Sequence, residues 1–216
     1  MNVLKPQNAI EKNILSDKEY MTAISIGRPR QGHKEGTIKI HIIQILEYIE
    51  QKYSKTKYYT NLRIIALLHD TGKFAFLKEV PVYMPEVSDK KCKKLLIASQ
   101  KFKTKYYNTK NVSFELKKYM FTPIHAEASY QFSKKFIKDK ELLKLIKYHD
   151  LGIDMALTYK DTKICDTKLF KKVFSNIDLN TYLAFVKCDA NNRIDITSRW
   201  LKSELKNNNI KIPKLN

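Results

Sequence analysis

The residues of this chain that could do chemistry are histidines and aspartates, spaced in the order of a metal site. In chain order they are His41, the doublet His69-Asp70, His125, His149 and Asp189. Imidazole is the commonest protein ligand of transition metals, and carboxylates complete such sites. We therefore take a catalytic metal centre as the leading hypothesis. Hydrolysis of a phosphate ester is the chemistry that such a centre most naturally performs.

The doublet lies where an apolar stretch ends, within Leu67 to Lys73. A carboxylate buried there would be costly unless it were paired or bound to a metal. Consecutive residues of a helix diverge by about 100°, so both can reach one ion only at a helix end or between their directions. Gly72 is expected to take the left-handed conformation that closes the helix. His41 could supply a third ligand and Asp189 a fourth.

Helices must position these residues, because the chain has only 5 glycines and 6 prolines to make turns. Apolar residues recur at helical spacing over 37–53, which predicts a helix with His41 on its inward face. The stretch 61–70 is apolar nearly all round and predicts a central helix. Further helices are expected over 125–136, 141–148 (stopped by Gly152), 178–192 and 195–205. The expected fold class is all-α, with ligands from several helices converging.

We expect one domain of ordinary size, over 27–193, with a basic insertion at about 86–114. Residues 1–26 would be an N-terminal extension, polar and irregular until the capping-box pattern from Ser16 to Glu19 starts a short helix. Residues 74–88 would be an extended connection. Residues 194–216 would form a C-terminal helix and tail.

The formal net charge is +19, from 41 basic and 22 acidic residues, which favours anionic partners. Residues 90–110 hold eight lysines, with Phe102, Tyr106 and Tyr107 among them. Such a segment could stack and bind single strands. The alternative, which the apolar residues around Leu96 favour, is an amphipathic helix with solvated lysines.

Nothing in the sequence predicts a membrane span, because the longest strictly apolar run extends only from Ile64 to Leu68. The first six residues lack the apolar stretch of a signal peptide. The three cysteines have no CxxC spacing and leave an odd thiol, which favours a reduced, cytoplasmic protein.

The quoted residues resemble the HD superfamily of metal-dependent phosphohydrolases over roughly 27–193: His41, the doublet within LLHDTGK, and Asp189 within VKCDA. The stretch 32–36 is similar to the His-x-Glu-Gly lead-in of HD domains related to those of bacterial tRNA nucleotidyltransferases. His125-Ala126-Glu127 and the sequence ending in His149 resemble later histidines of that group. The long basic segment between the doublet and His125 departs from the group and leaves the substrate open.

The resemblance implies that His41, His69, Asp70 and Asp189 bind a first metal ion. His125 and His149 would hold a second ion with Asp70 bridging, or would contact phosphate instead. Mixed imidazole and carboxylate ligands suit Mn, Fe, Co, Ni or Zn. The expected activity is a phosphodiesterase or phosphomonoesterase using metal-activated water. Its substrates would be nucleotides, cyclic phosphates or RNA ends.

Basic residues around the ligands are candidate phosphate contacts: Lys73, His33, Arg28, Arg30 and Arg193. Lys73, with Asp70 a candidate catalytic residue, either offsets charge on the phosphoryl oxygens or pairs with Asp70. The three loop residues either hold phosphate at the pocket mouth or stay exposed. Arg193 either reaches the substrate or caps its helix. Glu127 is expected to face solvent rather than support the ligands.

Two rival functions stay open at this point. A basic nucleic-acid-binding module with a structural metal site would use the net charge and the 90–110 segment. Structural metal sites, however, favour closed cysteine-rich shells. The other rival is oxygenase chemistry at a di-iron centre, which no sequence feature favours.

Overall fold

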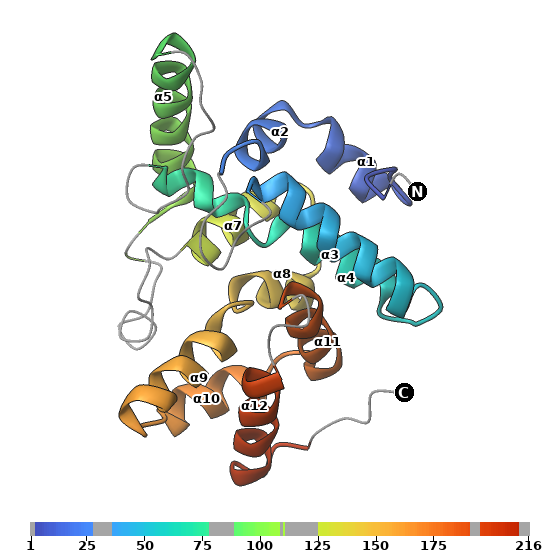
Figure 1. The fold of residues 1–216 in the computed structure, drawn as a ribbon, viewed down its shortest axis with the longest axis vertical. Coiled ribbons are helices and arrows are strands. Elements are labelled where there is room, and N and C mark those ends of the chain that lie inside the picture. The colour runs from blue at the N-terminus through green and yellow to red at the C-terminus, as the bar shows by residue number, and fades with distance from the viewer. Residues whose placement is uncertain are drawn as a thin grey trace.

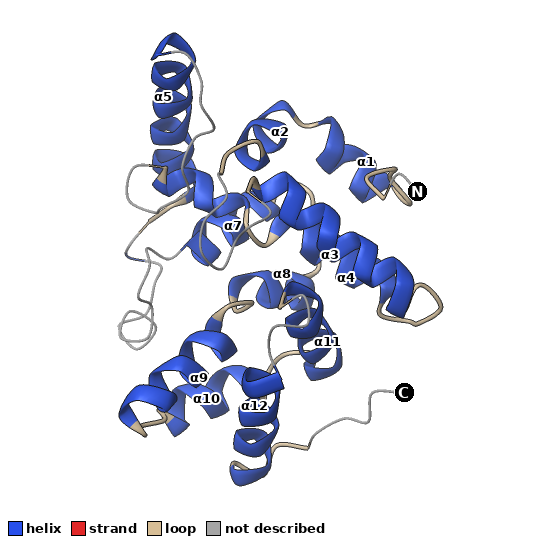
Figure 2. Cartoon of the chain, viewed as in Figure 1, coloured by secondary structure: helices blue, strands red, loops and turns tan. Residues whose placement is uncertain are grey.

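The computed structural model describes residues 3–27, 36–77, 89–108, 110, 125–190 and 195–211. In these ranges the chain is helical and contains no strand, as Figures 1 and 2 show, which confirms the all-α class. The elements are α1 (Ala9–Ser16), α2 (Lys18–Ile24), α3 (Ile38–Tyr53), α4 (Tyr59–Leu68), the 3-10 helix η1 (Thr71–Phe76), α5 (Asp89–Tyr106), α7 (His125–Ser133), α8 (Lys140–Lys147), α9 (Leu151–Thr162), α10 (Thr167–Phe174), α11 (Leu179–Asp189) and α12 (Asp195–Asn207).

Helix α4 forms the centre of the core, as its sequence predicts. Every residue from Leu62 to Leu68 is buried, and α3 runs beside α4 (Figure 1). The inward face of α3 buries Ile42 and Ile45, and His41 lies on the same face. Burial of one such Leu or Ile side chain contributes about 1.5–3 kcal/mol. The two helices that carry the first three candidate ligands are therefore fixed by apolar packing.

The N-terminal segment is more ordered than its polar sequence suggests. Helices α1 and α2 begin at side-chain caps: Asn8 Oδ1 accepts from Glu11 N, and Asp17 Oδ1 accepts from Tyr20 N. The expectation of an irregular start was wrong because Glu11 is buried against Arg63 of α4. Its carboxylate oxygens lie 3.0 Å from Arg63 Nε and 2.9 Å from Nη2. A two-point contact of this kind pins α1 to the core.

Helix α5 is the amphipathic helix that its apolar residues favour. Phe102 and Tyr106 are buried, and the Phe102 ring lies 5.5 Å from that of Phe74 in η1. The 3-10 helix η1 overlaps the stretch expected to be extended at residues 74–76, and there Ser99 Oγ donates to Phe74 O. Because both aromatic side chains face the core, they are not free to stack on bases. The stacking alternative for residues 90–110 loses these two rings.

The C-terminal helices differ from the expectation at Gly152. Helix α8 ends at Lys147, before that glycine, and Gly152 lies in the first turn of α9 instead. Its N–H donates to Tyr182 Oη at 2.9 Å, and a Cβ there would lie 2.7 Å from the same oxygen. Glycine is thus required by a close approach rather than by a helix end. The predicted helices near 178–192 and 195–205 are present as α11 and α12, whereas α9 and α10 were not predicted.

Within the described ranges, no helix combines the length and apolarity needed to span a membrane. No disulfide joins the three cysteines, all of which lie in the described part of the chain, and Cys188 is buried in α11. Helix α12 packs on α9 and α11, and the domain boundaries proposed from the sequence stay a prediction.

Candidate metal centre

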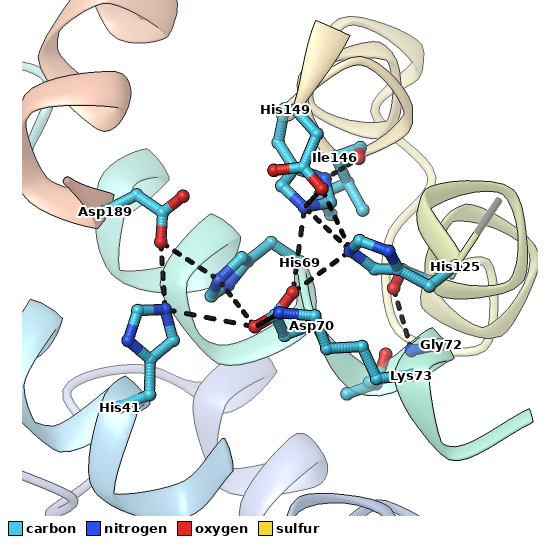
Figure 3. A network of polar contacts seen from close by, with 12 residues as sticks. His41, His69, Asp70, Gly72, Lys73, His125, Ile146, His149 and Asp189 are labelled. Atoms are coloured by element: carbon cyan, nitrogen blue, oxygen red, sulfur yellow. Dashed lines mark hydrogen bonds and ion pairs between the residues drawn. The ribbon is translucent and has the colours of Figure 1, made fainter. Parts of the chain in front are cut away.

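Three helices bring the first group of predicted ligands together. His41 comes from α3, His69 and Asp70 follow α4, and Asp189 ends α11 (Figure 3). His41 Nε2 lies 2.9 Å from Asp189 Oδ1 and 3.9 Å from Asp70 Oδ2. His69 Nε2 lies 3.5 Å from the same two oxygens. Residues 148 positions apart in sequence thus offer nitrogen and oxygen atoms to one point.

The doublet can point two side chains at this group because α4 ends there. Leu68 is the last residue of α4, His69 is its C-cap, and Asp70 opens η1 with φ −100° and ψ −1°. His69 Nδ1 lies 3.0 Å from Ala66 O, a partner that can only accept, so Nδ1 carries the proton. That tautomer turns the Nε2 lone pair toward the group, the arrangement typical of metal-binding histidines.

A second group faces the other oxygen of Asp70. His125 Nε2 lies 3.2 Å and His149 Nε2 lies 3.8 Å from Asp70 Oδ1. His149 Nδ1 lies 2.8 Å from Ile146 O, which fixes its tautomer as in His69. Figure 3 shows Asp70 between the two groups, with Oδ2 toward His41 and Oδ1 toward His125. The Asp70 carboxylate therefore bridges the two groups of side chains, with one oxygen facing each group.

Asp150 belongs to the second group, although it was not among the predicted ligands. Its Oδ2 lies 3.2 Å from His125 Nε2 and 3.4 Å from His149 Nε2. A signal for it exists in the sequence, because His149-Asp150 repeats the pattern of His69-Asp70. Weighing both doublets alike would have included it.

Gly72 sets the distance between η1 and α7. Its φ is not left-handed, so the predicted closing conformation was wrong. An added Cβ would lie 1.9 Å from His125 O and 2.5 Å from Ser129 N, and both are backbone atoms that cannot move aside. The Gly72 N–H also donates to Ser129 Oγ at 2.8 Å. Absence of a side chain at Gly72 therefore lets α7 bring His125 to Asp70.

Lys73 pairs with the bridging carboxylate, the second of its two expected roles. Its Nζ lies 2.6 Å from Asp70 Oδ2. Burial opposes ionisation of Asp70, but the charge of Lys73 and contacts with His69 and His125 hold its pKa well below the ordinary value. Burial likewise opposes the ammonium, yet the nearby carboxylates raise the pKa of Lys73. Asp70 is thus an anion at neutral pH, as a ligand must be.

The pKa values of the two histidines in the second group are shifted in opposite directions. Burial lowers the pKa of His125. Burial acts the same way on His149, but the charge of Asp150 outweighs it and raises the pKa of His149 well above its ordinary value. Burial and the charge of Asp150 also raise the pKa of Asp154 to about 8. Without a metal, both ring nitrogens of His149 are therefore protonated at neutral pH.

The donors present fit a divalent metal ion. Two groups offer atoms that lie within 4.8 Å of one another: His41, His69 and Asp70, and Asp70, His125 and His149. All five side chains are buried. His69 Nε2 is buried without a hydrogen-bond partner among the described residues, a costly arrangement for a polar atom that a cation would relieve. These groups could hold a metal ion.

Glu127 does not face solvent as expected. It is 1% exposed, its Oε1 accepts from Gln131 Nε2, and its Oε2 lies 3.1 Å from Lys147 Nζ. A buried carboxylate is costly unless it is paired. Glu127 therefore ties α7 to α8, the segment that ends in His149.

Four predicted phosphate contacts, Arg28, Arg30, His33 and Arg193, lie outside the described residues. Their roles stay predictions. Comparison of the chain with models of known protein families, with curated proteins and with solved structures finds no match in any of the three. The geometry of the site is therefore the main guide to the function.

Proposed function

We propose that this chain is a metal-dependent phosphohydrolase of the HD kind, acting on phosphate esters of nucleotides or RNA ends. The observation that carries the proposal is the bridging position of Asp70. One carboxylate faces His41 and His69 through Oδ2 and faces His125 and His149 through Oδ1. An arrangement of this kind suits two ions that share a carboxylate.

His41, His69, Asp70 and Asp189 would hold a first ion. His125 and His149 would hold a second together with Asp70, and Asp150 lies close enough to join them. Imidazole with carboxylate favours Mn, Fe, Co, Ni or Zn over magnesium. When bound, such an ion lowers the pKa of water toward about 7 and acts as a Lewis acid on a phosphoryl oxygen.

Neighbouring groups hold Asp70 as an anion and orient the rings of His69 and His149. Lys73 keeps Asp70 ionised through its 2.6 Å contact. Backbone carbonyl groups hold the Nδ1 protons of His69 and His149, which leaves each Nε2 directed at the site. Burial excludes water from these side chains, which strengthens every electrostatic interaction among them.

The nucleic-acid-binding module with a structural metal has less support. The metal groups contain histidine and aspartate without cysteine, whereas structural sites are usually cysteine-rich. The ring surfaces of Phe102 and Tyr106 are buried as well.

Hydrolysis of bis-p-nitrophenyl phosphate and p-nitrophenyl phosphate after reconstitution with Mn, Co or Ni tests the proposal. Replacement Asp70→Asn removes the bridging charge and is expected to lower turnover by about 10³-fold, because metal catalysis contributes several kcal/mol. The matched control is Asp161→Asn, which changes an exposed aspartate of α9 and should leave turnover unchanged. Circular dichroism of both variants checks that the helices remain. Equal turnover by Asp70→Asn and the wild type would refute the site.

A further inference from the structure

A concave surface lies on α7, which begins at His125, and on α8, which ends just before His149. It is a pocket of about 570 Å³ on α7, α8 and the turn between them. Its apolar lining includes the buried side chains of Ile137 and Leu143. Two half-buried tyrosines, Tyr130 of α7 and Tyr148 after α8, also line it. A pocket of this size and lining could accept a small planar group.

Every charged residue that lines this pocket is a lysine. They are Lys134, Lys138, Lys140, Lys144 and Lys147. Like charges that gather around a concavity raise the local concentration of ions of opposite sign. The pocket therefore favours an anionic ligand with several negative charges.

Three of these lysines are held in place by the protein. Lys134 Nζ lies 4.2 Å from the centroid of the Tyr130 ring, and Lys147 Nζ lies 4.9 Å from the same point. Lys147 also pairs with the buried Glu127, and Lys144 Nζ lies 2.7 Å from Glu141 Oε1. Side chains already restrained lose less entropy when a ligand binds.

Lys138 and Lys140 have no acidic partner among the described residues, and both are exposed. Lys140 is the first residue of α8, where a positive charge opposes the helix dipole. Helix stability therefore does not account for this lysine. Two unpaired ammonium groups at the pocket are free to contact phosphate.

We propose that the α7–α8 pocket binds single-stranded nucleic acid, with phosphates on the lysines and a base against the tyrosines. Lysines contribute sequence-independent affinity through counterion release, and aromatic rings accept any base. If the proposed hydrolase function holds, this pocket indicates that the substrate is a nucleic acid strand. That step rests on the proposed function. Strand binding itself can be measured without turnover.

The test is fluorescence anisotropy of a labelled single-stranded RNA of about 12 nucleotides, a length within the reach of such sites. The full chain is titrated at several salt concentrations between about 0.05 and 0.2 M. The test variant is Lys138→Gln/Lys140→Gln. Its matched control is Lys93→Gln/Lys94→Gln, which removes two exposed charges from α5. A gel after each titration confirms that the RNA is intact.

Each phosphate contact changes the salt slope for single strands by about 0.7, so the test variant should have a slope lower by about 1.4. At about 0.1 M salt, the same relation gives an affinity loss of about 25-fold. The α5 control should bind within about 2-fold of the wild type, since its charges lie outside the pocket. Equal losses of RNA affinity in both variants, or no RNA binding by the wild type, would overturn the proposal that this pocket binds the strand.

Two further probes separate other anionic ligands. If ATP binds at least as tightly as the RNA, with the same dependence on Lys138 and Lys140, then the ligand of the pocket is a free nucleotide rather than a strand. Phosphatidylserine vesicles preferred over RNA would replace it by a membrane surface. Either result would overturn the proposal as stated, whereas loss of ester hydrolysis with RNA binding retained would count against the hydrolase alone.

Discussion

Asp70 carries more of the site than any other residue, because each of its oxygens serves a different group of histidines. Lys73 contacts the same Asp70 oxygen that faces His41, so the ammonium group balances the charge of the carboxylate in the metal-free protein. A cation that binds there must compete with the ammonium of Lys73 for Oδ2. Lys73 thus offsets the cost of burying the Asp70 charge in the metal-free protein.

A metal ion held by His149 would bind with an affinity that depends on pH. In the metal-free protein its pKa is raised well above the ordinary value, so a metal ion must displace a proton at neutral pH. His125, whose pKa is lowered, needs no such displacement. We expect the apparent affinity for Co²⁺ or Mn²⁺ to rise about 10-fold per pH unit between about pH 6 and 8, as release of one proton requires.

Calorimetric titration in buffers of different ionisation enthalpy measures both the affinity and the proton released. The variant His149→Gln should bind more weakly and with little change over the same pH range. A wild-type affinity that stays constant over that range would contradict the assigned proton.

The histidines and aspartates singled out in the sequence lie together in the structure, although they come from different helices; their role as metal ligands stays a prediction. His41, His69, Asp70 and Asp189 do meet, and so do His125 and His149. Asp150 escaped because an aspartate after a histidine at the end of α8 also reads as a helix boundary. In the structure, its carboxylate contacts His125 of α7 and His149 of the α8–α9 turn.

At the scale of elements, the contact between η1 and α7 positions the second group. The substitution Gly72→Ala would force a Cβ against His125 O and Ser129 N. We expect a loss of about 3 kcal/mol, or about 6–12 °C in Tm, because neither backbone atom can yield without moving α7. Thermal unfolding followed by circular dichroism measures the change.

Ser129→Ala is the companion variant, since it removes only the hydroxyl that accepts from Gly72 N–H. An unsatisfied buried donor costs about 1–3 kcal/mol, so this variant should lose less than Gly72→Ala. A Tm for Gly72→Ala equal to that of the wild type would show that α7 can shift freely.

Helix periodicity located α3, α4 and α11, where apolar residues dominate one face or the whole surface. It missed α1, whose polar sequence gains its place from the pair between Glu11 and Arg63, residues 52 positions apart. It also misjudged Gly72 and Gly152, because a glycine required for close packing looks the same in sequence as one that ends a helix. Such contacts exist only after the chain has folded.

At the scale of the whole molecule, the formal net charge is +19, and the proposed pocket places five lysines on α7, α8 and the turn between them. A field of this sign would bring a phosphate-bearing strand toward the protein from any direction. The lysines held near Tyr130 would then favour binding of the strand at the α7–α8 pocket. Attraction and local capture are in this way separate properties of one chain.

The ligands also link distant parts of the chain, from His41 in α3 to Asp189 in α11. The unfolded chain scatters these residues, so a metal ion held by them would bind the folded state far better than the unfolded state and would stabilise the fold. At about 100 times its Kd, an ion adds about 2.7 kcal/mol, which corresponds to a Tm rise of about 5–11 °C. A chelator should reverse the rise in the wild type. Asp70→Asn should show little of it, and Asp161→Asn should show all of it. If Mn²⁺, Co²⁺, Ni²⁺ and Zn²⁺ all left the wild-type Tm unchanged, the buried histidines would have to be explained as a purely structural cluster.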